Sequence, residues 1–179
     1  DTHRDFVKAG AEVIVTTTFT TRRKRLKENN IEDKFEYLNK KAGEIAQEVK
    51  KEFTNILIAG GLPPQELTYE ADERSEEDIT KTFNEQAKLL NPYIDFFYFD
   101  VWSSIKEFKC GIKAIKEFKK PYLIGIHISE GTKLPSGEKV SDIKSILDDQ
   151  LLGVILSCVS PENYEKNLEE LKNLNVPFG

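Results

Sequence analysis

Residues that could bind or react with a ligand, four of them through their side chains, stand at the ends of five apolar runs in this sequence. In chain order the runs end on Thr18, Gly61, Asp100, His127 and Cys158. A thiol, an imidazole and a carboxylate that meet at one place suit a soft transition-metal site, or a cysteine nucleophile activated by a histidine base. A third interpretation is structural, because most free cysteines are small buried hydrophobic groups. All three stay open, since a catalytic zinc needs three protein ligands and the sequence has no CxxC or HExxH motif.

The run that ends on Cys158, residues 153–159, is apolar and rich in β-branched side chains. Ser160 and Pro161 follow it at once, which predicts a strand buried on both faces and a helix that begins near Pro161. In α/β proteins, ligands bind at the carboxyl ends of the strands. We therefore expect the five strand-end residues to lie along one edge of a sheet and to form the candidate site.

Strands and helices are expected to alternate along the whole chain. Strands are predicted at residues 12–19, 56–61, 96–100, 122–128 and 153–159, with a further strand starting at residue 176. Helices are predicted at residues 3–9, 35–53, 75–90, 105–118, 140–149 and 163–174. Strands that recur every ~25 to 40 residues are typical of parallel βαβ units rather than of hairpins. The sequence therefore predicts an α/β fold with about five parallel strands.

Two of these helices carry informative polar residues. Ser75 is expected to cap the helix 75–90, with Asp78 at the capping-box position, and Gln86 lies on the inward face of that helix. In the helix 105–118 an apolar stripe is expected to face inward, which would leave Cys110 away from the buried face. We assign Cys110 no role. The stripe consists of Ile105, Phe108, Ile112, Ile115 and Phe118.

Composition limits the classes of protein to consider. With 179 residues, 39% hydrophobic and 32% charged, the chain can bury a core and is expected to form one domain, residues 1–179. A net charge of −5 with mixed signs argues against nucleic-acid binding, and no apolar stretch approaches the ~18 residues of a membrane span. Two cysteines make no disulfide framework, so a cytoplasmic location is expected. A targeting segment and the oligomeric state stay open.

Six short motifs, in the same order, resemble those of one family, the homocysteine S-methyltransferases. This family includes betaine–homocysteine and S-methylmethionine–homocysteine methyltransferases, and the resemblance covers most of the chain. The motifs are His3-Arg4-Asp5-Phe6 with Ala9-Gly10-Ala11, Thr16-Thr17-Thr18-Phe19, Ala59-Gly60-Gly61, Phe99-Asp100, the loop 131–137, and Ser157-Cys158-Val159-Ser160-Pro161-Glu162.

The resemblance implies a (β/α)₈ barrel that binds Zn²⁺ and transfers a methyl group. In the family, zinc is held by the cysteine at strand six, here Cys158, and by two adjacent cysteines near the C-terminus. Zinc lowers the pKa of the homocysteine thiol, whose thiolate then attacks a methyl group on a sulfonium or ammonium donor to give methionine. No protein group is methylated, so no catalytic residue is assigned. Asp100 stands where the family has a glutamate that binds the substrate amino group, and Thr18, Gly61 and His127 complete the expected substrate site.

This sequence departs from the family pattern beside the metal ligand and in its length. Ile155 and Ser157 replace a glycine and an asparagine, Asp100 is one methylene shorter than glutamate, and His127 replaces a serine or threonine. A closed barrel needs about 250 residues, so we expect the chain to be an internal piece with strands two to six of a truncated barrel domain. The cysteine pair would then lie outside it, and the chain alone is expected to bind zinc weakly and to be inactive.

Two alternatives to this function are considered. One is another barrel enzyme, such as a lyase or aldolase, that uses His127 and Asp100; a lysine at a strand end would favour it, and none is found. The other is a degenerate, non-catalytic paralogue that binds a partner through its open sheet edges.

Overall fold

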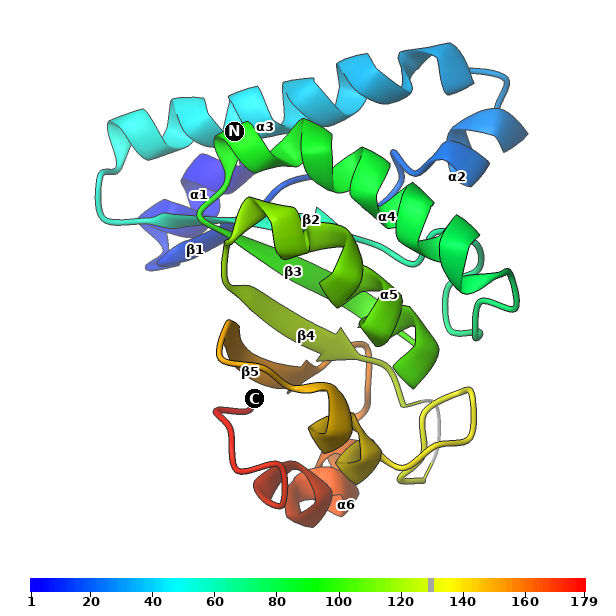
Figure 1. The fold of residues 1–179 in the computed structure, drawn as a ribbon. Helices are drawn as coiled ribbons and strands as arrows, with labels where there is room; N and C mark the ends of the chain where they lie inside the picture. The colour runs from blue at the N-terminus through cyan, green and yellow to red at the C-terminus, as the bar shows by residue number, and fades with distance from the viewer. Residues whose placement is uncertain (129–130) are drawn as a thin grey trace.

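The computed structural model describes residues 1–128 and 131–179. Its five strands form one sheet in chain order, and every neighbouring pair is parallel (Figure 1). The strands are β1 (Val13–Val15), β2 (Leu57–Leu62), β3 (Phe96–Trp102), β4 (Tyr122–Ile126) and β5 (Leu151–Leu156). The predicted α/β fold with five parallel strands is therefore confirmed.

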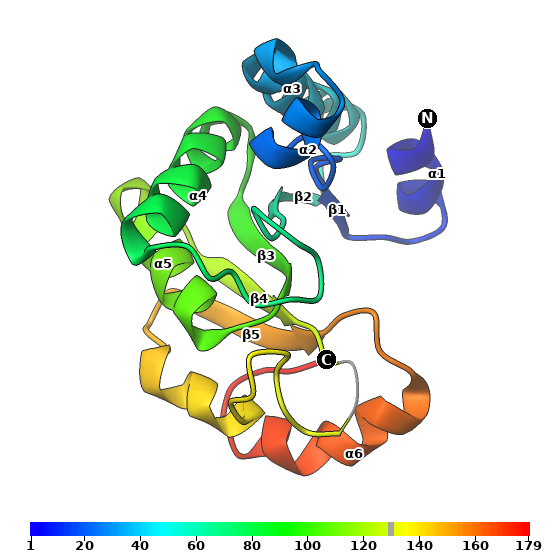
Figure 2. The same cartoon turned by 90° about the vertical axis from the view of Figure 1, so that its right-hand side faces the viewer.

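In residues 1–128 and 131–179, six α-helices precede, connect or follow these strands, and α3, α4, α5 and α6 lie around the outside of the sheet (Figure 2). The helices are α1 (Thr2–Lys8), α2 (Arg23–Glu28), α3 (Phe35–Glu52), α4 (Glu76–Leu90), α5 (Ile105–Ile115) and α6 (Pro161–Lys172). Short 3₁₀ segments at Glu32–Lys34, Asn91–Tyr93 and Lys116–Phe118 extend three of them. The short helix α2 was not expected from the sequence.

The α-helix predicted at residues 140–149 is wrong, because the structure has a 3₁₀ helix at Val140–Ile146. In this segment the Ser145 hydroxyl donates to the carbonyl of Asp142 at 2.8 Å. Serine side chains that bond the nearby backbone compete with regular α-helical hydrogen bonding. The segment then becomes extended at Leu147, four residues before β5 begins.

The sheet has a helix-covered face and a concave face, and side chains alternate between them with period two. On the covered face, Trp102 stacks on Phe99 and on Phe83 of α4, with ring centroids 4.2 and 4.1 Å apart. On the concave face a smaller apolar cluster surrounds Phe96 and Tyr98. The rest of that cluster consists of Ala59, Val15, Leu123 and Ile155.

Cys110 is buried, with 2% of its surface exposed, so the prediction that it lies away from the buried face is wrong. Its Sγ lies 3.6 Å from the carbonyl oxygen of Glu76 on α4. Helix α5 packs against α4 as well as against the sheet. The apolar stripe predicted from Ile105 to Phe118 accounts for the packing against the sheet but not for the packing against α4, where Cys110 lies.

The C-terminal residues run beside β5, as the predicted start of a further strand requires. The amide of Val154 donates to Pro177 O at 2.9 Å, and the amide of Gly179 donates to Val154 O at 3.1 Å. This pairing is parallel, like every other pair in the sheet. In residues 1–128 and 131–179, no helix is both long and apolar enough to cross a membrane.

Candidate functional site

The carboxyl ends of β3, β4 and β5 bring Asp100, His127 and Cys158 into one neighbourhood, which we call the rim cluster together with Tyr69. The ring of Tyr69 packs on the ring of His127, with centroids 4.2 Å apart and planes tilted by 43°. The pKa of Tyr69 is raised, first by the nearby Cys158 thiol, then by burial and by the Asp100 carboxyl. Tyr69 therefore connects all three residues predicted from the sequence.

Cys158 lies in the short loop between β5 and α6, rather than in the strand as predicted from the sequence. It is exposed, and its φ of 56° lies in the left-handed region that L-residues rarely adopt. Both ends of this loop are fixed: the amide of Ser157 donates to Ile126 O at 2.8 Å, and Ser160 Oγ caps α6 by accepting from Asn163 N at 3.2 Å. The loop therefore holds the thiol at the surface of the rim.

Tyr98 fixes the residue that precedes the thiol. Its ring crosses β4 on the concave face, and its hydroxyl lies 2.9 Å from Ser157 Oγ. A Cβ added to Gly125 of β4 would lie 2.7 Å from the Tyr98 ring and hydroxyl, which is closer than real Cβ contacts. Burial raises the pKa of Tyr98, so its hydroxyl stays protonated and can donate to Ser157. Glycine at position 125 thus allows a contact that reaches from β3 to the Cys158 loop.

Asp100 follows Tyr98 by two residues, so both side chains belong to the concave face of β3. The carboxyl is half-buried, and burial raises its pKa, while a hydrogen bond with Tyr98 partly opposes the rise. The register of β3 against β4 shifts between Phe99 and Trp102, and Val101 within this bulge has a φ of 66°. A β-branched residue in that conformation is strained by about 1–3 kcal/mol, and such strain is often found at functional sites.

His127 is nearly buried, with 7% of its surface exposed, at the end of β4. Its Nδ1 lies 3.3 Å from the carbonyl oxygen of Ser157. Burial lowers the pKa of His127, although the contact with Ser157 O acts in the opposite direction. The imidazole is therefore mainly neutral near pH 7 and can take part in hydrogen bonds without a full charge.

Thr18 and Gly61 lie side by side at the carboxyl ends of β1 and β2. The buried Thr18 hydroxyl donates to Gly61 O at 2.6 Å, and the amide of Gly61 donates to Thr16 Oγ1 at 3.0 Å. These bonds hold the two strand ends together. Because the Thr18 side chain has no exposed surface, it supports the strand ends and does not face a ligand directly.

A network of buried amide side chains supports these strand ends, and the sequence analysis did not identify it. Gln86 of α4 donates to Thr18 O at 3.3 Å and to Asn39 Oδ1 of α3 at 2.9 Å. Gln65 in turn donates to Gln86 Oε1 at 2.9 Å. The signal in the sequence was Gln86 itself, a polar residue within the apolar face of a helix.

Tyr69 was also missed, because it lies in the loop 63–75, where no periodic pattern points to any residue. The structure ties this loop to α2 and its flanking residues. Arg22 Nη2 donates to Thr68 Oγ1 at 3.2 Å, and Glu66 forms ion pairs with Lys24 at 2.5 Å and with Arg74 at 3.4 Å. These contacts place Tyr69 over His127.

The rim cluster can supply one ligand to a zinc ion, the thiol of Cys158, but not a complete zinc site. An exposed thiol such as Cys158 is a donor that zinc prefers. Yet within the part of the chain that the structure describes, no group of three or more His, Cys, Asp or Glu residues is arranged to hold a metal. A tetrahedral site would need further ligands in addition to Cys158.

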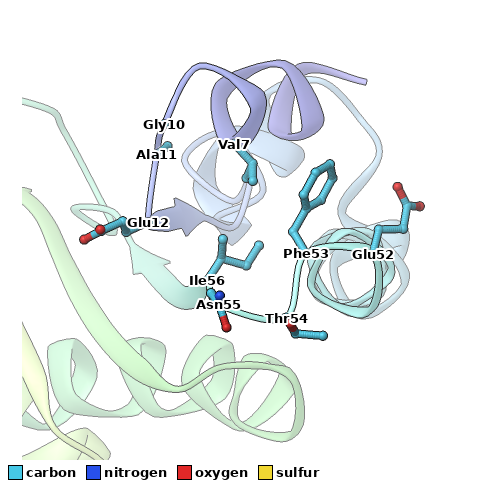
Figure 3. A pocket seen from close by; sticks show the side chains of 9 residues that line it. All are labelled: Val7, Gly10, Ala11, Glu12, Glu52, Phe53, Thr54, Asn55 and Ile56. Carbon is cyan, nitrogen blue, oxygen red and sulfur yellow. The ribbon is translucent and has the colours of Figure 1, made fainter.

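A separate cavity of about 400 Å³ lies at the opposite edge of the sheet, where the chain enters β1 and β2 (Figure 3). Val7, Phe53 and Ile56 line it together with Glu12 and Glu52. None of the residues predicted to bind substrate or metal lies there. In barrel proteins this edge mainly serves stability, so we place the functional site at the rim cluster.

Comparison with known proteins identifies sequence relatives. An S-methylmethionine–homocysteine S-methyltransferase (BHMT2) of Pongo abelii is 29% identical over 129 residues, which cover 71% of this chain and 33% of the relative. Betaine–homocysteine S-methyltransferase 1 of Danio rerio is 29% identical over 124 residues, which cover 66% of this chain and 30% of the relative. The chain therefore spans about a third of the length of these curated relatives.

Solved structures show the same fold. The crystal structure of the homocysteine methyltransferase MmuM from Escherichia coli matches 98% of this chain and 67% of its own, with a TM-score of 0.78 and 16% identity. The carboxyl transferase domain of Rhizobium etli pyruvate carboxylase matches with a TM-score of 0.53 and 14% identity, over 93% of this chain and 28% of its own. At these identities the likeness concerns the fold, which is of the α/β barrel type.

The sequence model of one family, homocysteine S-methyltransferase, matches residues 1–179, the whole of this sequence. The parallel sheet with its strands in chain order agrees with that match. The chain belongs to the homocysteine S-methyltransferase family.

Proposed function

We propose that this chain forms a partial barrel domain, residues 1–179, of an enzyme that methylates the thiol of homocysteine to give methionine. The observation that carries the proposal is the exposed Cys158 thiol beside Asp100 and His127, at the carboxyl edge of the sheet in a chain of this family. Its relatives act on homocysteine with S-methylmethionine or betaine as their names state. Both are 29% identical to this chain, so we propose a sulfonium or ammonium donor without choosing between them.

Asp100 is the residue that we propose to bind the ammonium group of homocysteine. Its half-buried carboxyl has a raised pKa, and an ammonium group brought next to it would favour the charged form. We propose Gly61 as part of the same substrate site, and Thr18 holds the end of β2 in place through its hydrogen bond to Gly61 O. The neutral His127 would offer a hydrogen bond to the substrate at the other side of the cluster.

The transfer itself needs a thiolate placed in line with the methyl group. The homocysteine sulfur forms a new bond to the methyl carbon, and the bond from that carbon to the donor sulfur or nitrogen breaks. Its electron pair stays on the donor, which leaves as a neutral thioether or tertiary amine. The protein's task is to orient the two substrates and to exclude water, so no residue of the chain becomes methylated.

We propose Cys158 as one ligand of a Zn²⁺ ion, with the other ligands outside the described residues. When bound, zinc would supply a homocysteine thiolate at neutral pH. The donor set supports this in part, because Cys158 is a free, exposed thiol on a fixed loop. The two free cysteines also support a reducing compartment, and we propose the cytoplasm.

The test is formation of methionine from homocysteine by the natural polypeptide that contains this sequence, with S-methylmethionine and with betaine. Cys158→Ser should lower the rate by at least about 100-fold, because loss of a metal ligand typically removes most of the metal and activity. Cys110→Ser is the matched control and should keep the rate of the folded protein within about twofold, because Cys110 lies between α5 and α4, away from the rim cluster.

Two results would contradict the proposed function. No methionine formation with either donor by the natural, zinc-loaded polypeptide would favour a non-catalytic paralogue. A rate for Cys158→Ser close to that of the unchanged protein would remove Cys158 from the proposed site.

A further inference from the structure

Tyr69 contacts two of the residues that we assign to the site, although it comes from a loop far from them in the sequence. Its ring lies on the His127 ring, with centroids 4.2 Å apart, and the Cys158 thiol is near enough to raise the pKa of Tyr69. His127 is 7% exposed, whereas Tyr69 itself is 44% exposed. The tyrosine therefore covers the histidine from the solvent side.

The backbone at Tyr69 is held in an unusual conformation. Its φ is 70°, in a region that costs an aromatic residue roughly 1–3 kcal/mol and persists only where the surroundings impose it. Those surroundings are the contacts on each side of it: Arg22 Nη2 donates to Thr68 Oγ1 at 3.2 Å, and Lys106 Nζ of α5 donates to Asp72 O at 3.2 Å. The loop is thus fixed at residues 68 and 72, and the residue between them that points to the rim is Tyr69.

His127, which the Tyr69 ring contacts, is also held in place. His127 Nδ1 lies 3.3 Å from Ser157 O, and Ser157 Oγ lies 2.9 Å from the hydroxyl of Tyr98. The backbone just before Cys158 is therefore held from β3 and from β4. The thiol side chain itself has Tyr69 as its neighbour from the loop 63–75.

We propose that Tyr69 is a positioning residue for the site: its ring holds the His127 imidazole in place, and its hydroxyl holds the Cys158 sulfur. The inference rests on the proposed function only for the role given to Cys158. Tyr69 would act through these two side chains and would not react with either substrate.

The hydroxyl contact is tested by the reaction of Cys158 with iodoacetamide in this 179-residue chain, with Cys110→Ser as the background. Rates are compared where they no longer rise with pH, so that the thiol is fully ionised and only its reactivity is measured. Tyr69→Phe removes the hydroxyl and keeps the ring. We expect it to react between about two- and tenfold faster, because the proposed hydrogen bond to the sulfur would be lost and the thiolate would become more nucleophilic.

Tyr37→Phe is the matched control, because Tyr37 is an exposed tyrosine on α3 and its replacement should leave the rate unchanged. A rate for Tyr69→Phe within about 1.5-fold of the background protein, or a slower one, would overturn the hydroxyl contact.

The ring contact is tested by proton NMR of the imidazoles, since the chain has only two histidines and His127→Asn assigns them. We expect the His127 ring protons to lie upfield in the unchanged chain and in Tyr69→Phe, and to move toward random-coil positions in Tyr69→Leu. Unchanged His127 signals in folded Tyr69→Leu would overturn the ring contact. Neither measurement uses homocysteine, a methyl donor or zinc, so its failure is distinct from failure of the proposed methyl transfer.

Discussion

Glu107 is a carboxyl with no exposed surface at the start of helix α5. Its Oε2 accepts a hydrogen bond from Ser104 Oγ at 2.8 Å, whereas its Oε1 has no hydrogen-bond partner among the described residues. Burial raises its pKa to about 7, with Asp72 adding to the rise and Ser104 opposing it. The folded state therefore favours protonated Glu107 over a range where the unfolded chain, with a pKa near 4.5, is already ionised. The stabilisation of the folded state by protonated Glu107 is full below pH ~4.5 and is lost as the pH rises through ~7.

We predict that Glu107→Gln raises the free energy of unfolding at pH 8 by about 1–3 kcal/mol, because it removes the energetic penalty of a buried charge. At pH 4.5 the two proteins should differ by less than about 1 kcal/mol, since glutamate is then protonated in the folded state. Urea denaturation at both pH values measures this, with the exposed Glu77→Gln of α4 as control. A loss of stability at pH 8 would show that the charge is needed at the start of α5.

The residues at the strand ends could be predicted because a parallel fold places every strand end at one edge. Asp100, His127 and Cys158 meet there for that reason alone. Tyr69 could not be predicted, since its place depends on the loop 63–75 and on ion pairs such as Glu66–Lys24 that have no periodic pattern. The burial of Cys110 was missed because helix-to-helix packing is not visible in a single apolar stripe.

At the scale of the elements, strand β4 has a glycine at the position where the Tyr98 side chain of β3 lies over it. Gly125 provides the space for Tyr98, which then reaches Ser157. We predict that Gly125→Ala lowers the free energy of unfolding by about 1–3 kcal/mol, because a Cβ would overlap the Tyr98 ring. In a Tyr98→Ala background the same change should be less destabilising, which chemical denaturation of the four proteins can measure. Equal effects in both backgrounds would show that the clash lies elsewhere, for example with the backbone of β3.

Three helices begin with a serine that accepts a hydrogen bond from the amide three residues later. Ser75, Ser104 and Ser160 do so at 3.1, 3.1 and 3.2 Å for α4, α5 and α6. The cap at Ser75 was predicted, and the same pattern explains the other two. We expect Ser75→Ala to lower the free energy of unfolding by about 0.5–2 kcal/mol, whereas Ser141→Ala in the 3₁₀ segment should have a smaller effect. A chemical denaturation midpoint of Ser75→Ala equal to that of the unchanged chain would contradict a stabilising cap.

Element type and order followed from hydrophobic periodicity, but element ends did not. β1 ends at Val15 although the β-branched run continues to Thr18, because the backbone after Thr16 turns to bring the Thr18 hydroxyl onto Gly61 O. The segment 140–149 has a helical pattern of apolar residues yet forms 3₁₀ turns. In both places side-chain hydrogen bonds to the backbone accompany the change, one between neighbouring strands and one within the segment, and residue patterns do not show them.

At the scale of the whole molecule, the two edges of the sheet differ. In the described part of the chain β1 has β2 as its partner on one side and no strand on the other, whereas the far edge of β5 pairs with the C-terminal residues. The apolar cluster around Phe96 and Tyr98 lies on the concave face between them. Unpaired strand edges beside apolar surface favour association between copies.

We predict that the 179-residue chain self-associates as its concentration rises, and that Val13→Lys on β1 reduces this association. Val13 is exposed, and a lysine at a strand edge opposes pairing with another strand. Sedimentation velocity over a range of concentrations measures it, with the exposed Tyr37→Lys of α3 as control. A chain that stays monomeric throughout would show that the edge of β1 is protected.

The central claim concerns Cys158 as a metal-binding thiolate of a homocysteine methyltransferase. X-ray absorption at the zinc edge of the natural, zinc-loaded polypeptide tests it most directly, because it counts sulfur ligands at about 2.3 Å from the metal. We predict that Cys158→Ser removes one sulfur from that count and that Cys110→Ser leaves it unchanged. The same number of sulfur ligands in the unchanged protein and in Cys158→Ser would contradict the account.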